Sequence, residues 1–251
     1  MVALIPARAG SQRVPHKNTR RLAGHPLLAY TLAAARQSGV FDEGVWVSSN
    51  DETALHIATD AGVHVMSCLA KPWLHTDRGR DIEWVRDALC VIRLTPARPD
   101  AFAILRPTSP FRTAETLQRA AAQFRRIGAR GDSLRAMRRV REHPGKMWWR
   151  GAESGDRFSL DSVYPVCPHA HRDGTPWHSS PTQSLPAVYV QTSSLELAWT
   201  RVVDAGTIAG TCVWPFVCEG LDGFAIDTEA DWAEAERIAA WRPDLLPRVD
   251  G

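Results

Sequence analysis

The sequence predicts an α/β fold of the Rossmann-like, three-layer α/β/α type, in which helices cover both faces of a mainly parallel sheet. Three observations lead to this expectation. The chain begins with a short apolar run, Val2 to Ile5, that ends at Pro6. Short apolar segments then alternate with longer segments of helical periodicity. A length of 251 residues with 44% apolar content is enough to fill one substantial core.

The first predicted strand leads into a loop at its carboxyl end, which is where ligands bind in open α/β sheets. Pro26 to Gly39 is rich in Ala and Leu at helical spacing and ends on a glycine, so it predicts a crossover helix. The next elements are predicted in this order: a strand at 45–49, a helix at 51–61 capped by Asn50 or Asp51, a strand at 63–66, a helix at 81–93, a strand at 101–105 and a helix at 114–127.

The pattern changes after Asp132. Residues 142–186 hold six prolines, four glycines, four histidines and three tryptophans without sustained periodicity. Such a segment is too long for an ordinary loop, and its aromatic content favours an arm, a lid or a subunit contact over disorder. We therefore expect one domain over 1–251 with 142–186 inserted. Strands at 187–199 and 211–217 and a helix at 228–241 follow it.

Charge and cysteine content limit the classes of protein. Thirty basic and 28 acidic residues give a net charge of +2, too balanced for a chain that coats nucleic acid or an anionic membrane. The arginines between Arg125 and Arg141 could bind nucleic acid locally, but a solvated face is the simpler interpretation. Five scattered cysteines, no basic leader and no apolar run near ~20 residues predict a cytoplasmic protein outside the membrane.

The loop after the first strand has the composition of a phosphate cradle. Ala9-Gly10-Ser11 offers small residues and accessible backbone N–H groups, and Arg8, Arg13 and Lys17 supply positive charge. It contains neither the Walker motif nor the dinucleotide-binding glycine pattern. From composition alone, a phosphate cradle and a basic surface turn are both possible.

The whole segment from Ile5 to Asn18 resembles I-P-A-R-x-G-S-x-x-x-P-x-K-N, the signature of the cytidylyltransferases that activate acidic sugars such as sialic acid. Later segments resemble further motifs of that family in the same order. They are Val47–Asp51, Lys71-Pro72, Leu105–Arg112, His143–Met147, Leu185–Tyr189 and Gly223–Trp232.

The resemblance implies a fold of the nucleotide-diphospho-sugar transferase type. It also implies a reaction in which a hydroxyl of the acidic sugar attacks the α-phosphorus of CTP and pyrophosphate leaves. Catalytic roles would belong to Arg8, Lys17 and Asp227. The expected nucleotide site consists of Ala7, Arg8, Ala9, Gly10, Ser11, Lys17, Asn18, Lys71, Asp77, Arg78, Pro107 and Thr108. Arg106 and Ser109 would extend this site toward the acceptor.

Triphosphate chemistry generally uses Mg²⁺, which prefers one or two carboxylates together with phosphate oxygens and water. Asp227 is the expected metal ligand, unless Asp227 or Thr228 merely caps the last helix. The family pattern D-I-[DN] is broken, because Ala225 replaces its first carboxylate. Asp222, Glu219 or a water could substitute for it, or the metal could bind more weakly.

The acceptor side also departs from the family. Gln191, Thr192 and Ser193 replace the usual N-G-A, and their polar groups could bind a hydroxylated acid or satisfy strand neighbours. Arg135 and Arg138 occupy a segment that is strand-like in the family, and they could hold an acid or face solvent.

Together these observations predict a Mg²⁺-dependent cytidylyltransferase that uses CTP and a sialic-acid-like nonulosonic acid. The resemblance implies a homodimer in which the inserted arm contacts the partner. Two alternatives remain at this point. One is a related enzyme for a Kdo-like or phosphonate acid, or for a different nucleotide. The other is a nucleotide-binding paralogue that does not catalyse transfer.

Overall fold

The computed structural model describes residues 1–69, 79–150 and 163–249. The chain forms two compact units. The main unit consists of residues 1–137 and 191–251, and the inserted unit consists of residues 138–190. The inserted unit contains the whole segment 142–186. Among the described residues, no helix is long and apolar enough to cross a membrane.

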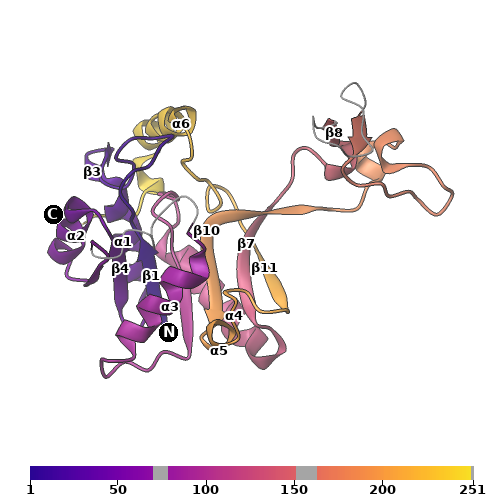
Figure 1. The fold of residues 1–251 in the computed structure, drawn as a ribbon. Coiled ribbons are helices and arrows are strands. Elements are labelled where there is room, and N and C mark those ends of the chain that lie inside the picture. The colour runs from indigo at the N-terminus through magenta and orange to yellow at the C-terminus, as the bar shows by residue number, and fades with distance from the viewer. Residues whose placement is uncertain (70–78, 151–162, 250–251) are drawn as a thin grey trace. The chain divides into compact units, whose positions relative to one another are not determined.

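The main unit is built on a seven-stranded sheet with the order β11-β7-β10-β6-β1-β4-β5 (Figure 1). Four neighbouring strands run parallel, as predicted: β1 (Val2–Pro6), β4 (Val45–Ser49), β5 (His64–Ser67) and β6 (Ala101–Ile104). β10 (Tyr189–Trp199) runs antiparallel to β6, whereas β7 (Ser133–Arg139) and β11 (Val213–Val217) are parallel to each other.

Helices cover both faces of this sheet, because successive side chains of a strand point to opposite faces and both sets are apolar here. Ala3 and Ile5 of β1 pack with α1 (Leu27–Ser38), α2 (Glu52–Asp60) and α4 (Ala114–Ile127). Val2 and Leu4 pack instead with α3 (Asp81–Ile92) and α5 (Arg201–Asp204). The three-layer prediction is confirmed.

The predicted elements of the first half agree with the structure within one or two residues at each end. The strand β7 and the short hairpin of β2 (Arg21–Leu22) and β3 (His25–Pro26) were not predicted. β7 escapes prediction because arginines interrupt its apolar alternation, although Ser133 to Ala136 are all buried. Pairing partners elsewhere in the chain make that burial possible.

A third apolar cluster lies beside the carboxyl end of β1 and joins the first loop to the last helix, α6 (Glu229–Trp241). Its buried members are Val14, Leu22, Leu27, Tyr30, Phe111, Ile226, Trp232 and Ala235. The Arg20 guanidinium lies 4.1 Å above the Trp232 ring and also pairs with Glu229. This cluster therefore holds the two ends of the main unit's chain side by side.

The inserted unit has its own small sheet, in which β8 (Trp148–Arg150) pairs antiparallel with β9 (Val163–Pro165). Trp177 packs against the rings of His143 and His169, at centroid distances of 5.8 and 4.8 Å. Lys146 donates to the carbonyl oxygens of His178 and Ser180. The unit is thus organised by aromatic packing and by the hydrogen bonds of Lys146.

Arg112 is a fully buried cation that links three elements of the main unit. It donates to the carbonyl oxygens of Arg106 and Ser194 and, at 2.9 Å, to the Thr31 hydroxyl. Desolvation lowers the pKa of its guanidinium to about 9. The loop after β6 is therefore fastened to β10 and α1 by one side chain.

We expect Arg112→Leu to lower the free energy of unfolding by about 2–4 kcal/mol, because two buried carbonyl groups lose their donor. Urea denaturation measures the change. Arg86→Leu, at an exposed position of α3, serves as the control and should stay within about 0.5 kcal/mol. Equal stability of Arg112→Leu and wild type would contradict this role.

Candidate active site

The loop after β1 is fastened to the neighbouring strand β4. The Ala7 amide donates to the Ser48 carbonyl at 2.9 Å, and the Ala9 amide donates to Asn50 Oδ1 at 2.8 Å. Of the two predicted caps for α2, Asp51 is the one observed, since its carboxylate accepts from the first amides of that helix. Asn50 is thereby available to hold the loop, a role the sequence did not indicate.

The far end of the same loop is closed by Asn18, which is 8% exposed. Its Nδ2 donates to the Arg8 carbonyl at 3.0 Å, and its own carbonyl accepts the Leu28 amide. Gly10, at the tip, has φ = +76°, a left-handed conformation that costs glycine nothing. Ala9 and Gly10 border a cavity of about 420 Å³ together with His16, Thr19, Leu69 and residues 50–53.

Lys17 connects this loop to the segment before α6. Its Nζ donates to the Ile226 carbonyl at 2.9 Å and lies 3.6 Å from Asp227 Oδ1. Burial lowers the pKa of Lys17, the Asp227 carboxylate opposes that shift, and the positive charges of Arg13 and Arg8 add to it. The site therefore holds a cation that is partly desolvated and close to other cations, as a receptor for phosphate groups requires.

Asp227 faces this cationic group instead of capping the last helix. Its carboxylate is 3.6 Å from both Lys17 and Arg13, and its side chain is 47% exposed. Thr228 is the cap, in a capping box with Asp231. Across the described ranges, no group of three His, Cys, Asp or Glu residues could hold a metal by itself.

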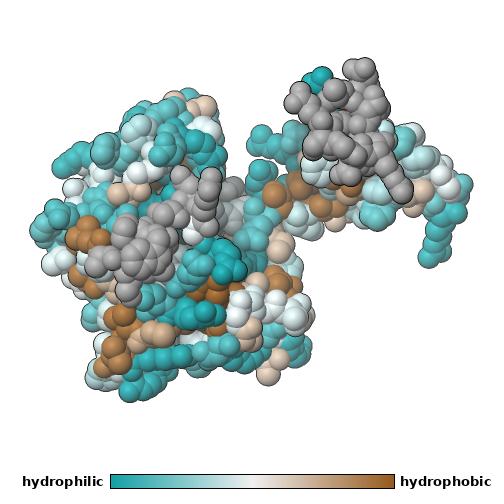
Figure 2. Space-filling model, in the orientation of Figure 1, coloured by the Kyte–Doolittle hydropathy of each residue, from teal (hydrophilic) through white to brown (hydrophobic). Residues whose placement is uncertain are grey.

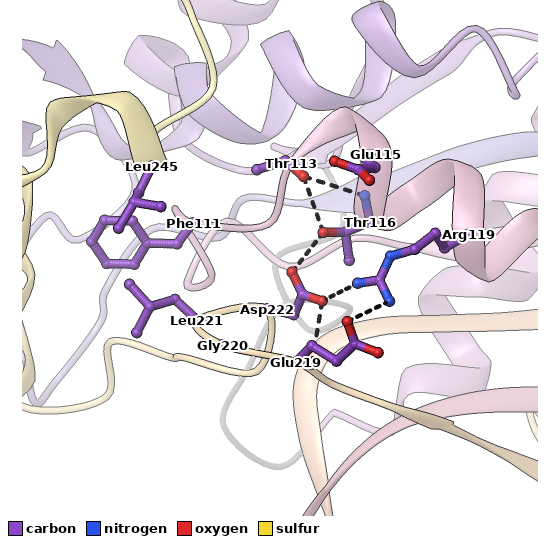
Figure 3. A pocket seen from close by; sticks show the side chains of 10 residues that line it. All are labelled: Phe111, Thr113, Glu115, Thr116, Arg119, Glu219, Gly220, Leu221, Asp222 and Leu245. Atoms are coloured by element: carbon purple, nitrogen blue, oxygen red, sulfur yellow. Dashed lines mark hydrogen bonds and ion pairs between the residues drawn. The ribbon is translucent and has the colours of Figure 1, made fainter.

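Asp222 and Glu219, the carboxylates considered as substitutes for the one lost at Ala225, are both directed at α4. Arg119 of α4 lies 2.5 Å from Asp222 Oδ2 and 3.4 Å from Glu219 Oε2 (Figure 3). The Thr116 hydroxyl donates to Asp222 Oδ1 at 2.6 Å. These groups line a pocket of about 330 Å³. Their contacts with Thr116 and Arg119 fasten this part of the chain to α4.

The segment after β6 brings residues predicted for the nucleotide site and for the acceptor site next to Asp227. The Thr108 carbonyl accepts the Ile226 amide at 2.8 Å, and the hydroxyls of Thr108 and Ser193 are 3.4 Å apart. Pro107 and Ser109 are buried, the latter 1% exposed. Thr192 donates to the Ala136 carbonyl, so it serves a strand neighbour, whereas Gln191 is exposed.

Two guanidinium groups and two carboxylates form a network below this region. Arg106 Nη2 is 2.7 Å from Asp81 and 3.2 Å from Glu196, and Arg135 forms an ion pair with Glu196. Burial by itself would raise the pKa of Asp81. The positive charge of Arg106 and the hydrogen bonds from the Trp84 indole and from Arg106 outweigh that effect, so the pKa of Asp81 is below its usual value. The sequence left two roles open for Arg135, holding an acid or facing solvent. The structure shows a third: Arg135 is buried and neutralises the carboxylate of Glu196.

Glu196 was not predicted as part of the site. A signal was present, because it is a charged residue between the apolar Leu195 and Leu197 of a predicted strand. The structure thus groups the residues of the first loop, Pro107 to Ser109, Ser193 and Asp227 at one end of the sheet. Lys71, Asp77 and Arg78 lie outside the described residues.

Known proteins are similar to this chain in sequence. A family model described as cytidylyltransferase matches residues 2–130. CMP-N,N'-diacetyllegionaminic acid synthase of Legionella pneumophila is 30% identical over 98% of this chain and 99% of its own length. Pseudaminic acid cytidylyltransferase of Campylobacter jejuni is 32% identical over 49% of this chain and 52% of its own length.

Solved structures support the same fold. A CMP:2-keto-3-deoxy-manno-octonic acid synthetase complexed with CTP aligns over 96% of this chain and 98% of its own, with a TM-score of 0.64 at 14% identity. A 4-diphosphocytidyl-2C-methyl-D-erythritol synthase from Anaerococcus prevotii aligns over 95% and 97%, with a TM-score of 0.59 at 11% identity. By the family match and the full-length relative, this chain belongs to the cytidylyltransferase family of CTP-dependent enzymes.

Proposed function

We propose that this protein transfers CMP from CTP to an acidic sugar of the nonulosonic acid class and releases pyrophosphate. The observation that carries the proposal is the contact of Lys17 with Ile226 and Asp227, which places a cation and a carboxylate at the mouth of the glycine-containing loop. The similarity to the legionaminic acid enzyme over almost the full length of both chains supports the choice of acceptor class.

In this reaction an acceptor hydroxyl oxygen bonds to the α-phosphorus, the bond from that phosphorus to the bridging oxygen breaks, and the hydroxyl proton passes to solvent. Negative charge builds on the leaving pyrophosphate. Lys17 and Arg8, with the backbone N–H groups of Gly10 and Ser11, are the groups that we assign to stabilise it. The fastened loop holds these donors in place before the substrate arrives, which avoids reorganisation during transfer.

Asp227 fits the requirements of a Mg²⁺ ligand. Mg²⁺ commonly takes one or two carboxylates and completes its shell with phosphate oxygens and water, so a single half-exposed carboxylate beside the phosphate loop is sufficient. Mg²⁺ bound there supplies further neutralisation of phosphate charge. Ala225 contributes no ligand, and Asp222 and Glu219 are committed to Arg119.

The acceptor site that we propose combines hydroxyl and guanidinium groups. Thr108, Ser193 and the exposed Gln191 can pair with sugar hydroxyls. Arg106 is 25% exposed and uses Nη2 for both of its described ion pairs. Its Nη1 and Nε hydrogens can therefore donate to the acceptor's carboxylate.

We place the reaction in the cytoplasm. All five cysteines are free thiols in the structure, including the exposed Cys90 and Cys212. Free thiols persist in reducing compartments, whereas oxidising ones favour disulfides.

The direct test is pyrophosphate release with CTP, Mg²⁺ and a panel of acids: N,N'-diacetyllegionaminic, N-acetylneuraminic, pseudaminic and 2-keto-3-deoxy-manno-octonic acid. We expect at least one nonulosonic acid to give the highest kcat/KM, by about tenfold or more over the octonic acid. Preference for the octonic acid, or for UTP or GTP over CTP, would replace the proposed substrate. CTP binding without turnover for every acid would favour a non-catalytic paralogue.

The lowered pKa of Lys17 predicts how activity responds to pH. Lys17 stabilises phosphate charge only when protonated, so kcat/KM for CTP should fall as pH rises through a pKa lower than that of an ordinary lysine. Lys17→Arg should move this alkaline limb to higher pH, since arginine stays charged. An alkaline limb at the same pH in both proteins would show that another group titrates.

We also propose that the protein is a homodimer joined through the inserted unit. This unit exposes large side chains, and apolar surface is visible on it in Figure 2. The exposed residues are Met147, Trp148, Trp149, Val163, Tyr189 and Val190. A two-stranded sheet alone is marginally stable, and a second copy of the unit would cover these side chains.

Light scattering tests the dimer. The wild type should have twice the chain mass of 27.8 kDa, and Trp149→Asp should shift it toward one chain, because a charge would enter an apolar interface. Trp241→Asp is the matched control, since that tryptophan is 79% exposed at the end of α6. A wild type of single-chain mass would contradict the proposed dimer.

A further inference from the structure

The segment Glu219–Thr228 joins β11 to α6 and carries Asp227, and one buried carboxylate anchors it. Asp222 is 9% exposed. It accepts hydrogen bonds from the Thr116 hydroxyl at 2.6 Å, from Arg119 Nη2 at 2.5 Å and from the Glu219 amide at 3.4 Å (Figure 3). Two of the three donors belong to α4, so Asp222 fastens the segment to that helix.

The same segment is in contact with the active site a few residues further on. The Phe224 ring packs edge-on against Phe111, with centroids 5.4 Å apart. Ile226 is fully buried; its amide donates to Thr108, and its carbonyl accepts from Lys17. The anchor at Asp222 and these contacts therefore lie on one short stretch of chain that ends at Asp227.

The helix α4 begins directly after the loop that carries Thr108. Fastening Glu219–Thr228 to α4 therefore fixes the distance between two parts of the proposed site, the loop with Thr108 and the carboxylate of Asp227. A charged hydrogen bond that is largely buried is stronger and more directional than an exposed one. The anchor can thus set a position as well as stabilise the fold.

We propose that Asp222 is a positioning residue for cytidylyl transfer: through Thr116 and Arg119 it holds Glu219–Thr228 so that Asp227 stands at the correct place beside Lys17. This inference rests on the proposed function for its kinetic part. It also assigns a role to one of the carboxylates considered as a substitute for the one lost at Ala225, and that role is structural support of the site and not ligation.

The first test is hydrogen–deuterium exchange of the free protein, which needs neither CTP nor metal. In Asp222→Ala, the amides of Phe224, Ile226 and Asp227 should exchange about tenfold faster or more, while amides of β1 and α1 stay within about twofold. Asp222→Asn keeps an acceptor for Thr116, so its exchange rates should lie between those of the wild type and of Asp222→Ala. The asparagine variant also replaces the alanine variant if the latter does not fold. Unchanged exchange at these amides, or an equal increase everywhere, would overturn the proposal.

The second test is a double-mutant cycle on kcat. Asp222→Ala should lower kcat about 10- to 100-fold in the wild type, as expected for loss of a charged hydrogen bond, but by less than about threefold in an Asp227→Asn background. A merely structural role would give the same factor in both backgrounds. If the wild type transfers no CMP to any acceptor, the proposed function fails, while the exchange experiment still decides whether Asp222 positions Asp227.

Asp132 supplies the matched control. Its carboxylate also anchors a loop, accepting from the amides of Thr211 and Cys212 and pairing with Arg201. It lies next to Trp199, which pairs with the first residue of β6, at the end of the sheet away from the site. Asp132→Ala should speed exchange only near Thr211 and Cys212 and leave kcat within about twofold; a loss of kcat equal to that of Asp222→Ala would overturn the proposal.

Discussion

The partly buried ammonium group of Lys17 makes the contacts on which the rest of the active site depends. An ammonium group removed from water must find acceptors, and here the Ile226 carbonyl and the Asp227 carboxylate supply them. Ile226 is 209 positions from Lys17 along the chain. Lys17 therefore joins the loop after β1 to the segment before α6, beside an apolar cluster that contains Val14, Ile226 and Trp232.

The arginines divide into two groups with different tasks. Arg112 and Arg135 are buried and pair with protein carbonyls or with Glu196, so they organise the loop after β6 and the neighbouring strands. Arg13 is 69% exposed and lies beside Asp227, and Arg106 is partly exposed beside Asp81 and Glu196. The small net charge thus conceals a local concentration of cations where a triphosphate and an acid would meet.

Much of this could be predicted from the sequence because the responsible signals are local. Apolar periodicity located β1, β4 and β6 with the helices between them, and the motif from Ile5 to Asn18 located the loop. Side-chain partners that lie far apart in sequence could not be predicted. Arg135 is buried because it pairs with Glu196, and the Asp222 carboxylate points at α4 because it pairs with Arg119. The residues next to Arg135 and Asp222 in sequence do not indicate these distant partners. The choice between Asn50 and Asp51 as a cap likewise depended on the loop that Asn50 holds.

The most direct measurement of the central claim is a crystal structure of the protein with CTP and Mg²⁺. The account predicts that the phosphates lie against the backbone N–H groups of Gly10 and Ser11 with Lys17 within hydrogen-bond distance, and that Asp227 is the protein carboxylate at the metal. Triphosphate bound away from the loop after β1, or a metal held by carboxylates other than Asp227, would contradict it.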